Sequence, residues 1–354
     1  MSRARSFSKL INKDNYATYR GSDSVTDISA VSLPQGTLNF RNKIINGNFD
    51  IWQRGTSQTS SGYGSADRWV NLHAGSTKTA SQQAFTVGQT DVPGNPKYYL
   101  RNVVSSVAGT GNYCLVLQRI EGVETLAGQT ATLSFWAKAD SNKNIATEFL
   151  QYFGTGGSPS ALVNTIGVTT HNLTTSWQKF TATVAVPSIS GETLGSDGND
   201  RLELNFWFEA GSDFDSRTNS LGQPDNATTY EVDIAQVQLE IGPVPTPFEH
   251  RPYGTELALC QRYYETDDAE NGADTRISMN KGTTAASYYW SYPYKVTKRA
   301  LPTVTINQTY DDNLTLYYNS GSATKSHMGL NNATGGSSDT RALAEFNWTA
   351  DAEL

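Results

Sequence analysis

The clearest strand pattern in the chain is Leu202-Glu203-Leu204-Asn205-Phe206-Trp207-Phe208, in which large apolar residues occupy every second position. A second stretch, Thr132-Leu133-Ser134-Phe135-Trp136-Ala137-Lys138, follows the same rule. Successive side chains of a β-strand point to opposite faces of its sheet, so this period of two predicts strands with one buried face. The buried face takes Leu202, Leu204, Phe206, Phe208, Leu133, Phe135 and Ala137, which leaves Trp207 and Trp136 on the other side.

Short strands of this kind, separated by Gly- and Ser-rich turns, continue through residues 42–242. The composition of the 354 residues agrees, with 17% charged and 11% aromatic residues and 30 glycines. A typical soluble domain has about 25% charged residues, and a disordered chain has few aromatic ones. The remaining Thr, Asn and Gly suit strands and turns. We therefore predict an all-β protein built on an antiparallel β-sandwich.

A proline-rich segment, 243–247, ends this region because it can neither pair as a strand nor coil into a helix. Residues 256–265 then carry apolar side chains at helical spacing and are predicted to form one short linking helix. Strand patterns return over 275–354 and predict a smaller second β-sandwich. One of these strands alternates Tyr288, Trp290, Tyr292 and Tyr294, which either pack on a sandwich face or form an exposed tip.

Charge is divided unevenly between the beginning of the chain and the rest. The net charge is −7, yet residues 1–20 contain five basic residues and one acidic residue. Residues 1–40 lack a sustained hydrophobic period and are predicted to form an extended arm. The acidic body argues against general nucleic-acid binding. No stretch has the length and apolarity of a membrane span or a secretory signal. From the charge and from this absence, we expect neither nucleic acid nor a membrane as a partner.

No enzyme motif is apparent. The four histidines lie in separate regions, and neither a Gly-x-Ser-x-Gly elbow nor a phosphate-binding glycine loop is present. The pair Asp267-Asp268 is interpreted as a solvated turn. Cys114 and Cys260 match no zinc or redox spacing and are predicted to be isolated buried thiols, although a disulfide is also compatible with the sequence. We expect a protein without enzymatic activity and without a cofactor.

Four ordered stretches resemble the galactose-binding-like, jelly-roll type of carbohydrate-binding module. They are Ile45-Asn46-Gly47-Asn48-Phe49-Asp50 with Asp67-Arg68-Trp69, residues 131–139, residues 176–187 and residues 234–240. The resemblance implies a jelly-roll domain that binds glycans. Family members commonly hold a structural calcium with an Asp pair in the last strand. Ala235 and Gln236 stand at those positions, and Asp50 and Asp233 alone offer carboxylates nearby, so we expect no metal.

Further stretches resemble virion proteins of tailed bacteriophages, especially fibre-like and receptor-binding components. They are residues 42–56, Pro247-Phe248-Glu249-His250-Arg251-Pro252, Cys260-Gln261-Arg262-Tyr263-Tyr264 and Ala350-Asp351-Ala352-Glu353-Leu354. The resemblance implies location in a virion, a homotrimer, and a glycan of the host cell surface as a partner. The expected organisation is a virion-anchoring arm (1–40), a jelly-roll carbohydrate-binding-like domain (41–245), a linker with the helix (246–270) and a C-terminal β-sandwich (271–354).

The arm is expected to contact other virion proteins through Arg3, Arg5, Phe7 and Lys9. The predicted glycan face is the polar side of the two patterned strands, where aromatic rings stack on sugars and amides or carboxylates bind hydroxyls. Its candidate residues are Trp136, Trp207, Glu203, Asn205 and Tyr152. Alternatively, the two tryptophans lie under a loop or at a subunit interface. The rival functions are a purely architectural virion protein, such as a capsid decoration or tail adaptor, and a polysaccharide depolymerase.

Overall fold

The computed structural model describes residues 40–222, 224, 226, 228–267, 275–280, 288–312, 314–333 and 341–354. The predicted arm, with Arg3, Arg5, Phe7 and Lys9, lies outside the described residues apart from Phe40. Residues 41–354 form one compact unit. In the part of the chain that is described, no helix combines the length and apolarity needed to cross a membrane.

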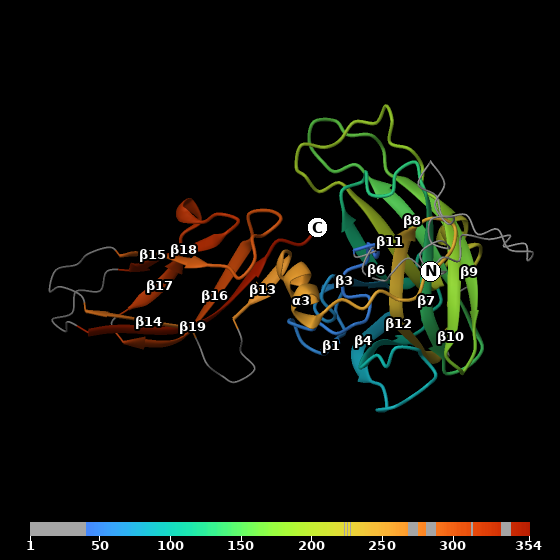
Figure 1. The fold of residues 1–354 in the computed structure, drawn as a ribbon, viewed down its shortest axis with the longest axis horizontal. Helices are drawn as coiled ribbons and strands as arrows, with labels where there is room; N and C mark the ends of the chain where they lie inside the picture. The colour runs from blue at the N-terminus through green and yellow to red at the C-terminus, as the bar shows by residue number, and fades with distance from the viewer. Residues whose placement is uncertain are drawn as a thin grey trace, which may run out of the picture. The chain divides into compact units, whose positions relative to one another are not determined.

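Two six-stranded antiparallel sheets make the larger β-sandwich, as predicted (Figure 1). Sheet 1 has the order β1 (Ser57–Gln58), β4 (Thr77–Ala84), β5 (Tyr98–Ser105), β12 (Thr229–Ile241), β7 (Thr130–Ala139) and β10 (Gln178–Ala185). Sheet 2 has the order β2 (Gly62–Tyr63), β3 (Trp69–Ala74), β6 (Tyr113–Glu121), β11 (Arg201–Ala210), β8 (Lys143–Tyr152) and β9 (Val163–Leu173).

The alternating strands β7 and β11 meet across the core of this sandwich. The rings of Phe135 and Phe206 lie edge to face, with centroids 5.0 Å apart, and neither ring is exposed. All seven apolar residues assigned to the core from the alternation belong to the same buried cluster. Short segments η3 (Ser212–Phe214) and α2 (Asp215–Thr218) follow β11. Cys114 and Cys260 are free and buried, as expected.

The linking helix is α3 (Tyr253–Gln261), which begins and ends earlier than the predicted 256–265. The helix cannot continue because Tyr264–Thr266 forms β13, which pairs with residues 349–351. The backbone carbonyl of Tyr263 also accepts a hydrogen bond from the Ala352 amide at 2.7 Å. Tertiary strand pairing therefore overrides the local helical pattern.

Two further antiparallel sheets follow α3 and confirm the smaller second sandwich. One contains β13 (Tyr264–Thr266), β19 (Arg341–Asp351) and β14 (Thr275–Asn280), with β16 (Thr303–Asp312) also paired to β19. The other has the order β15 (Tyr289–Pro293), β18 (His327–Ala333) and β17 (Thr315–Tyr318), with η5 (Ser320–Ser322) between β17 and β18. Trp290, Tyr292 and Tyr294 pack into the core between these sheets, which confirms the packed-face interpretation for these three residues of the aromatic row.

Candidate functional site

The predicted glycan residues do not form one face. Trp136 lies on β7 of sheet 1, whereas Trp207 lies on β11 of sheet 2. Each side chain points away from the common core, as the alternation predicted. Because the two sheets pack face to face, their outer surfaces are on opposite sides of the sandwich. The prediction that the two tryptophans share one surface is therefore wrong. Trp136 itself is half-buried.

Trp207 is covered rather than open to a ligand. It is 1% exposed, and its ring lies 5.3 Å from that of Phe214 in η3. Its indole Nε1 donates a hydrogen bond to Glu148 Oε2 at 3.1 Å, and Arg217 of α2 donates to both oxygens of the same carboxylate at 2.8 Å. Asn205, also 1% exposed, donates to Glu148 Oε2. The segment η3–α2 thus covers this face, which agrees with the alternative placement under a loop.

Glu203 and Tyr152 lie farther along the same outer face of sheet 2 and are engaged by arginines. Glu203 is 6% exposed, and its Oε2 accepts hydrogen bonds from Arg119 and Arg201, each at 3.2 Å. The Arg201 guanidinium stacks 4.1 Å from the centre of the half-buried Tyr152 ring. The structure therefore places four of the predicted residues on the outer face of sheet 2, where Trp207, Asn205 and Glu203 are buried and Tyr152 is half-buried, and leaves Trp136 apart from them.

The outer face of sheet 1 is also occupied by ion pairs. Asp233 is 2% exposed, receives two hydrogen bonds from Arg101 at 2.8 and 2.9 Å, and lies 3.7 Å from Lys138 Nζ. Its carboxylate therefore has cationic partners within the chain. Among the described residues, no group of three or more His, Cys, Asp and Glu side chains is arranged to hold a metal.

A cavity of about 750 Å³ forms a groove that we call the junction groove. It runs between the segment 48–56, the loop before β5 and the helix α3. The aromatic rings lining it are those of Trp52, Tyr98, Tyr253 and His250. Side-chain amides come from Asn48, Gln53, Gln82, Asn95 and Gln261, carboxylates from Asp50 and Asp267, and ammonium groups from Lys97 and Lys295.

One wall of the junction groove depends on a glycine. Gly94 has a φ of +80°, and a Cβ built there would lie 2.5 Å from His250 Nε2. A larger residue at this position would push the loop away from the histidine. Gln236, itself at a positive φ in β12, donates from Nε2 to the neighbouring Pro93 carbonyl at 2.7 Å. These contacts hold the loop against the segment that contains His250.

Asp50 is one of the two acidic residues that line the groove. Asn48 Nδ2 donates to Asp50 Oδ2 at 2.8 Å. Burial raises the pKa of Asp50, while the hydrogen bond from Asn48 and the charges of Lys97 and His250 act in the opposite direction. Burial also holds the pKa of His250 below its usual value. The Asp50 carboxylate is therefore a hydrogen-bond acceptor in the lining of the groove.

The prediction of a solvated turn at Asp267-Asp268 is wrong for Asp267. It is 7% exposed and lines the junction groove, and its Oδ1 accepts a hydrogen bond from the Trp348 amide at 3.1 Å. Its neighbour Asp268 lies outside the described residues. The pairing of β13 with β19 pulls this part of the chain inward, which a local reading of two adjacent acids cannot reveal.

The four stretches that carry the phage resemblance converge beside the junction groove. Arg251 donates to the Ile44 carbonyl at 3.1 Å, and Gln53 Nε2 donates to the Tyr264 carbonyl at 3.0 Å. Arg54 lies over the Tyr264 ring at 3.6 Å and pairs with Glu353 at 3.1 Å. Segments more than 200 residues apart in sequence thus build one structural centre.

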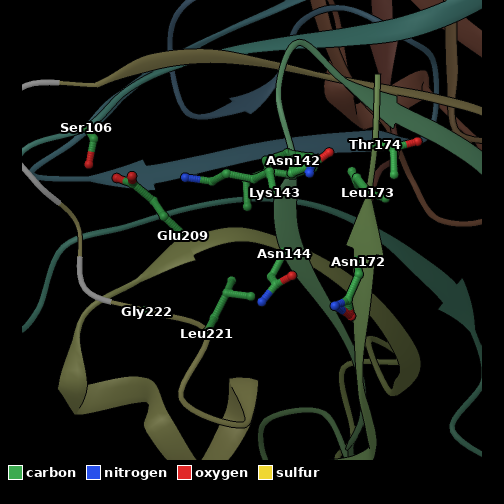
Figure 2. A pocket seen from close by; sticks show the side chains of 11 residues that line it. Ser106, Asn142, Lys143, Asn144, Asn172, Leu173, Thr174, Glu209, Leu221 and Gly222 are labelled. Atoms are coloured by element: carbon green, nitrogen blue, oxygen red, sulfur yellow. The ribbon is translucent and has the colours of Figure 1, made fainter. Parts of the chain in front are cut away.

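A second cavity of about 410 Å³, which we call the end pocket, opens at one end of the larger sandwich (Figure 2). Its lining comes from the ends of β8, β9 and β11 in sheet 2, from Ser106 directly after β5, and from the segment after α2. Figure 2 shows the Glu209 carboxylate and the Lys143 ammonium pointing toward one another across it. The other lining residues are Ser106, Asn142, Asn144, Asn172, Leu173, Thr174, Phe208, Leu221 and Gly222.

Comparisons with known proteins give structural similarities only. No protein-family model and no curated protein matches the chain. Among solved structures, a tailspike protein 4 domain of bacteriophage CBA120 shows 15% identity and a TM-score of 0.29 over 57% of this chain. This chain spans 21% of the length of that tailspike chain.

Two further similar structures are shorter than this chain. A family 11 carbohydrate-binding module of Clostridium thermocellum shows 10% identity and a TM-score of 0.30, over 55% of this chain and 98% of the module. A putative sugar-binding protein of Bacteroides thetaiotaomicron shows 12% identity and a TM-score of 0.31, over 57% of this chain and 100% of that one. With these TM-scores, the similarities carry no conclusion about the function of this chain.

Proposed function

We propose that this protein is a non-enzymatic virion protein of a tailed bacteriophage that adheres to host-surface glycans through the junction groove. The observation that carries the proposal is the lining of that groove. Aromatic rings, five amides and two carboxylates belong to residues that line one cavity of about 750 Å³. Aromatic faces pack on the C–H surfaces of sugars, and amides and carboxylates exchange hydrogen bonds with hydroxyls.

The virion assignment rests on the sequence resemblance of the stretches that converge beside the groove. In this proposal the arm attaches the protein to other virion proteins, and homotrimers and the particle multiply weak glycan contacts. Linked binding sites raise avidity over single-site affinity by roughly 10²–10⁴ when the geometry permits joint engagement. A shallow groove with weak affinity for one glycan chain is then sufficient for adhesion.

The test compares two exposed tyrosines. Tyr253 lines the groove and is 64% exposed, whereas Tyr289 is 67% exposed on β15 and does not line it. We expect Tyr253→Ala to weaken binding to extracted host polysaccharide by about fivefold to tenfold, because a stacked ring contributes about 1 kcal/mol. Tyr289→Ala is the matched control and retains wild-type binding in the same calorimetric titration.

Other outcomes separate the rivals. Equal glycan binding by wild type and Tyr253→Ala would remove the groove from the proposal. Full adsorption of particles that carry a groove-deficient protein would favour the architectural role. Release of reducing ends from host polysaccharide by the purified protein would favour the depolymerase. A density map of the virion that lacks this protein would refute the virion assignment.

A further inference from the structure

The end pocket contains a buried carboxylate that is turned inward by a β-bulge. Trp207 pairs with Leu115 in β6, but Glu209 pairs with Cys114, so Phe208 is an extra residue in β11. Cys114 points into the sandwich core. Regular alternation would place Glu209 on the outer face with Trp207, whereas the bulge directs it to the core side. Bulges often re-aim a side chain next to a functional site.

Glu209 is only half satisfied in this position. The residue is 4% exposed, and its Oε2 accepts a long hydrogen bond from the Tyr230 hydroxyl at 3.4 Å. Its Oε1 is buried and has no hydrogen-bond partner among the described residues. A buried acceptor without a donor destabilises the folded protein, and a charged one does so more strongly than a neutral one. The pocket beside it provides the space in which a donor from a ligand can bind.

The charges around the pocket limit what that ligand can be. Lys143 Nζ lies 3.4 Å from the centre of the Tyr230 ring, whose hydroxyl contacts Glu209. Lys143 and Glu209 are the charged side chains in the described lining. Because these two charges are opposite, neither an anionic nor a cationic ligand gains a net electrostatic advantage from the pair. A neutral hydroxyl suits both, because it donates to a carboxylate and accepts from an ammonium group at the same time.

The remaining lining suits the same ligand class. Asn144 and Asn172 are register partners at the ends of β8 and β9, and Figure 2 shows their side chains on the same side of the pocket as Leu221. Leu173 and Phe208 add apolar surface. A volume of about 410 Å³ falls within the usual range of small-ligand pockets, about 300–1,000 Å³.

We infer that the end pocket is a second carbohydrate site, which binds a single neutral hexose unit with Glu209 as its central hydroxyl acceptor. This inference goes beyond the proposed function, because the end pocket and the junction groove share no lining residue. One site would hold a glycan chain along the groove, and the other would hold one sugar ring at the end of the sandwich.

The experiment uses the full chain and ligand-observed saturation-transfer NMR. The probes are glucose, galactose, mannose and N-acetylglucosamine, with glucosamine and glucuronate as the cationic and anionic counterparts of glucose. We expect at least one neutral hexose to bind, and Glu209→Gln to weaken that binding about tenfold or more through loss of a charge-assisted hydrogen bond. Glu192→Gln, which changes an exposed loop acid, is the matched control and retains binding.

The outcomes separate this inference from the proposed function. Hexose binding that survives Tyr253→Ala but not Glu209→Gln supports the end pocket. Binding lost in Tyr253→Ala and kept in Glu209→Gln assigns the sugar to the junction groove and overturns the inference. Absence of binding by all four neutral hexoses, or equal binding of the charged counterparts, also overturns it. If circular dichroism shows that Glu209→Gln is unfolded, Asn172→Ala replaces it with the same expected loss.

Discussion

Glu353 holds two buried arginines, and its replacement by glutamine should strongly destabilise the protein. Its Oε1 lies 3.1 Å from Arg54 Nη2, and its Oε2 pairs with Arg68. The side chains of Arg54, Arg68 and Glu353 are 7%, 1% and 5% exposed. Removing one partner of a buried ion pair typically lowers stability by about 3–5 kcal/mol, because the other charge remains buried. We expect Glu353→Gln to fall in this range.

The structure indicates which arginine dominates this loss. Arg54 retains Asp351 at 3.5 Å, so it keeps a carboxylate after the substitution. Arg68 is left stacked 3.4 Å from the Tyr263 ring, with Nη2 donating to the Arg119 carbonyl. Its Nε already has no partner among the described residues. Most of the destabilisation should therefore come from Arg68.

The measurement is urea unfolding at neutral pH, followed by tryptophan fluorescence, with the free energy taken from linear extrapolation. Asp351→Asn is the matched control, because it removes the other carboxylate near Arg54. That side chain is 43% exposed, and an exposed pair contributes about 0–1 kcal/mol. A loss below about 1 kcal/mol in Glu353→Gln, or an equal loss in both variants, would refute the reasoning.

Three further substitutions test other parts of the sandwich. Burial lowers the pKa of His171 to about 4. The neutral imidazole therefore supports the folded state above pH 6.5, and this support is lost as the pH falls toward 4. Relative to His171→Gln, the wild type should lose roughly 3 kcal/mol of unfolding free energy over this range in urea titrations. Glu148→Gln should lower the free energy of unfolding by about 3 kcal/mol, and it should shift the fluorescence of Trp207 to the red as η3–α2 loosens; unchanged emission would contradict the covering role. A Cβ at position 47 would lie 2.1 Å from the Val237 carbonyl, so Gly47→Ala should destabilise the protein by about 1–3 kcal/mol in thermal unfolding, and a neutral effect would show that the backbone yields.

Local alternation predicted which side of each strand faces the core, but not which surfaces remain open. Phe135 and Phe206 were assigned to the core correctly because burial on one face imposes a period of two. The same rule placed Trp207 on the outer side, where it lies. Its cover comes from Phe214 and Arg217, which reach it only after the chain has turned back over the sheet.

The prediction that Trp136 and Trp207 share one face was wrong for a related reason. Strand order decides whether Trp136 and Trp207 belong to one sheet, and that order follows from long-range pairing rather than from either strand alone. The junction groove could not be predicted from local sequence either, because its lining residues Asp50 and Tyr253 come from segments about 200 residues apart. The only available signal was that the stretches resembling phage proteins include parts of both walls, around Trp52 and His250.

Because Phe208 has no partner in β6, the face of the sheet on which Glu209 lies depends on the number of residues in these two strands as well as on residue identity. Inserting one residue into β6 between Cys114 and Leu115 would give Phe208 a partner, restore the strict alternation of β11 and turn Glu209 to the outer surface, with its chemical identity unchanged. Glu209 would then leave the end pocket for the protein surface because of a shift in strand register alone. Comparison of related chains should therefore track insertions and deletions at this position, since aligned glutamates on strands of different register would face different environments.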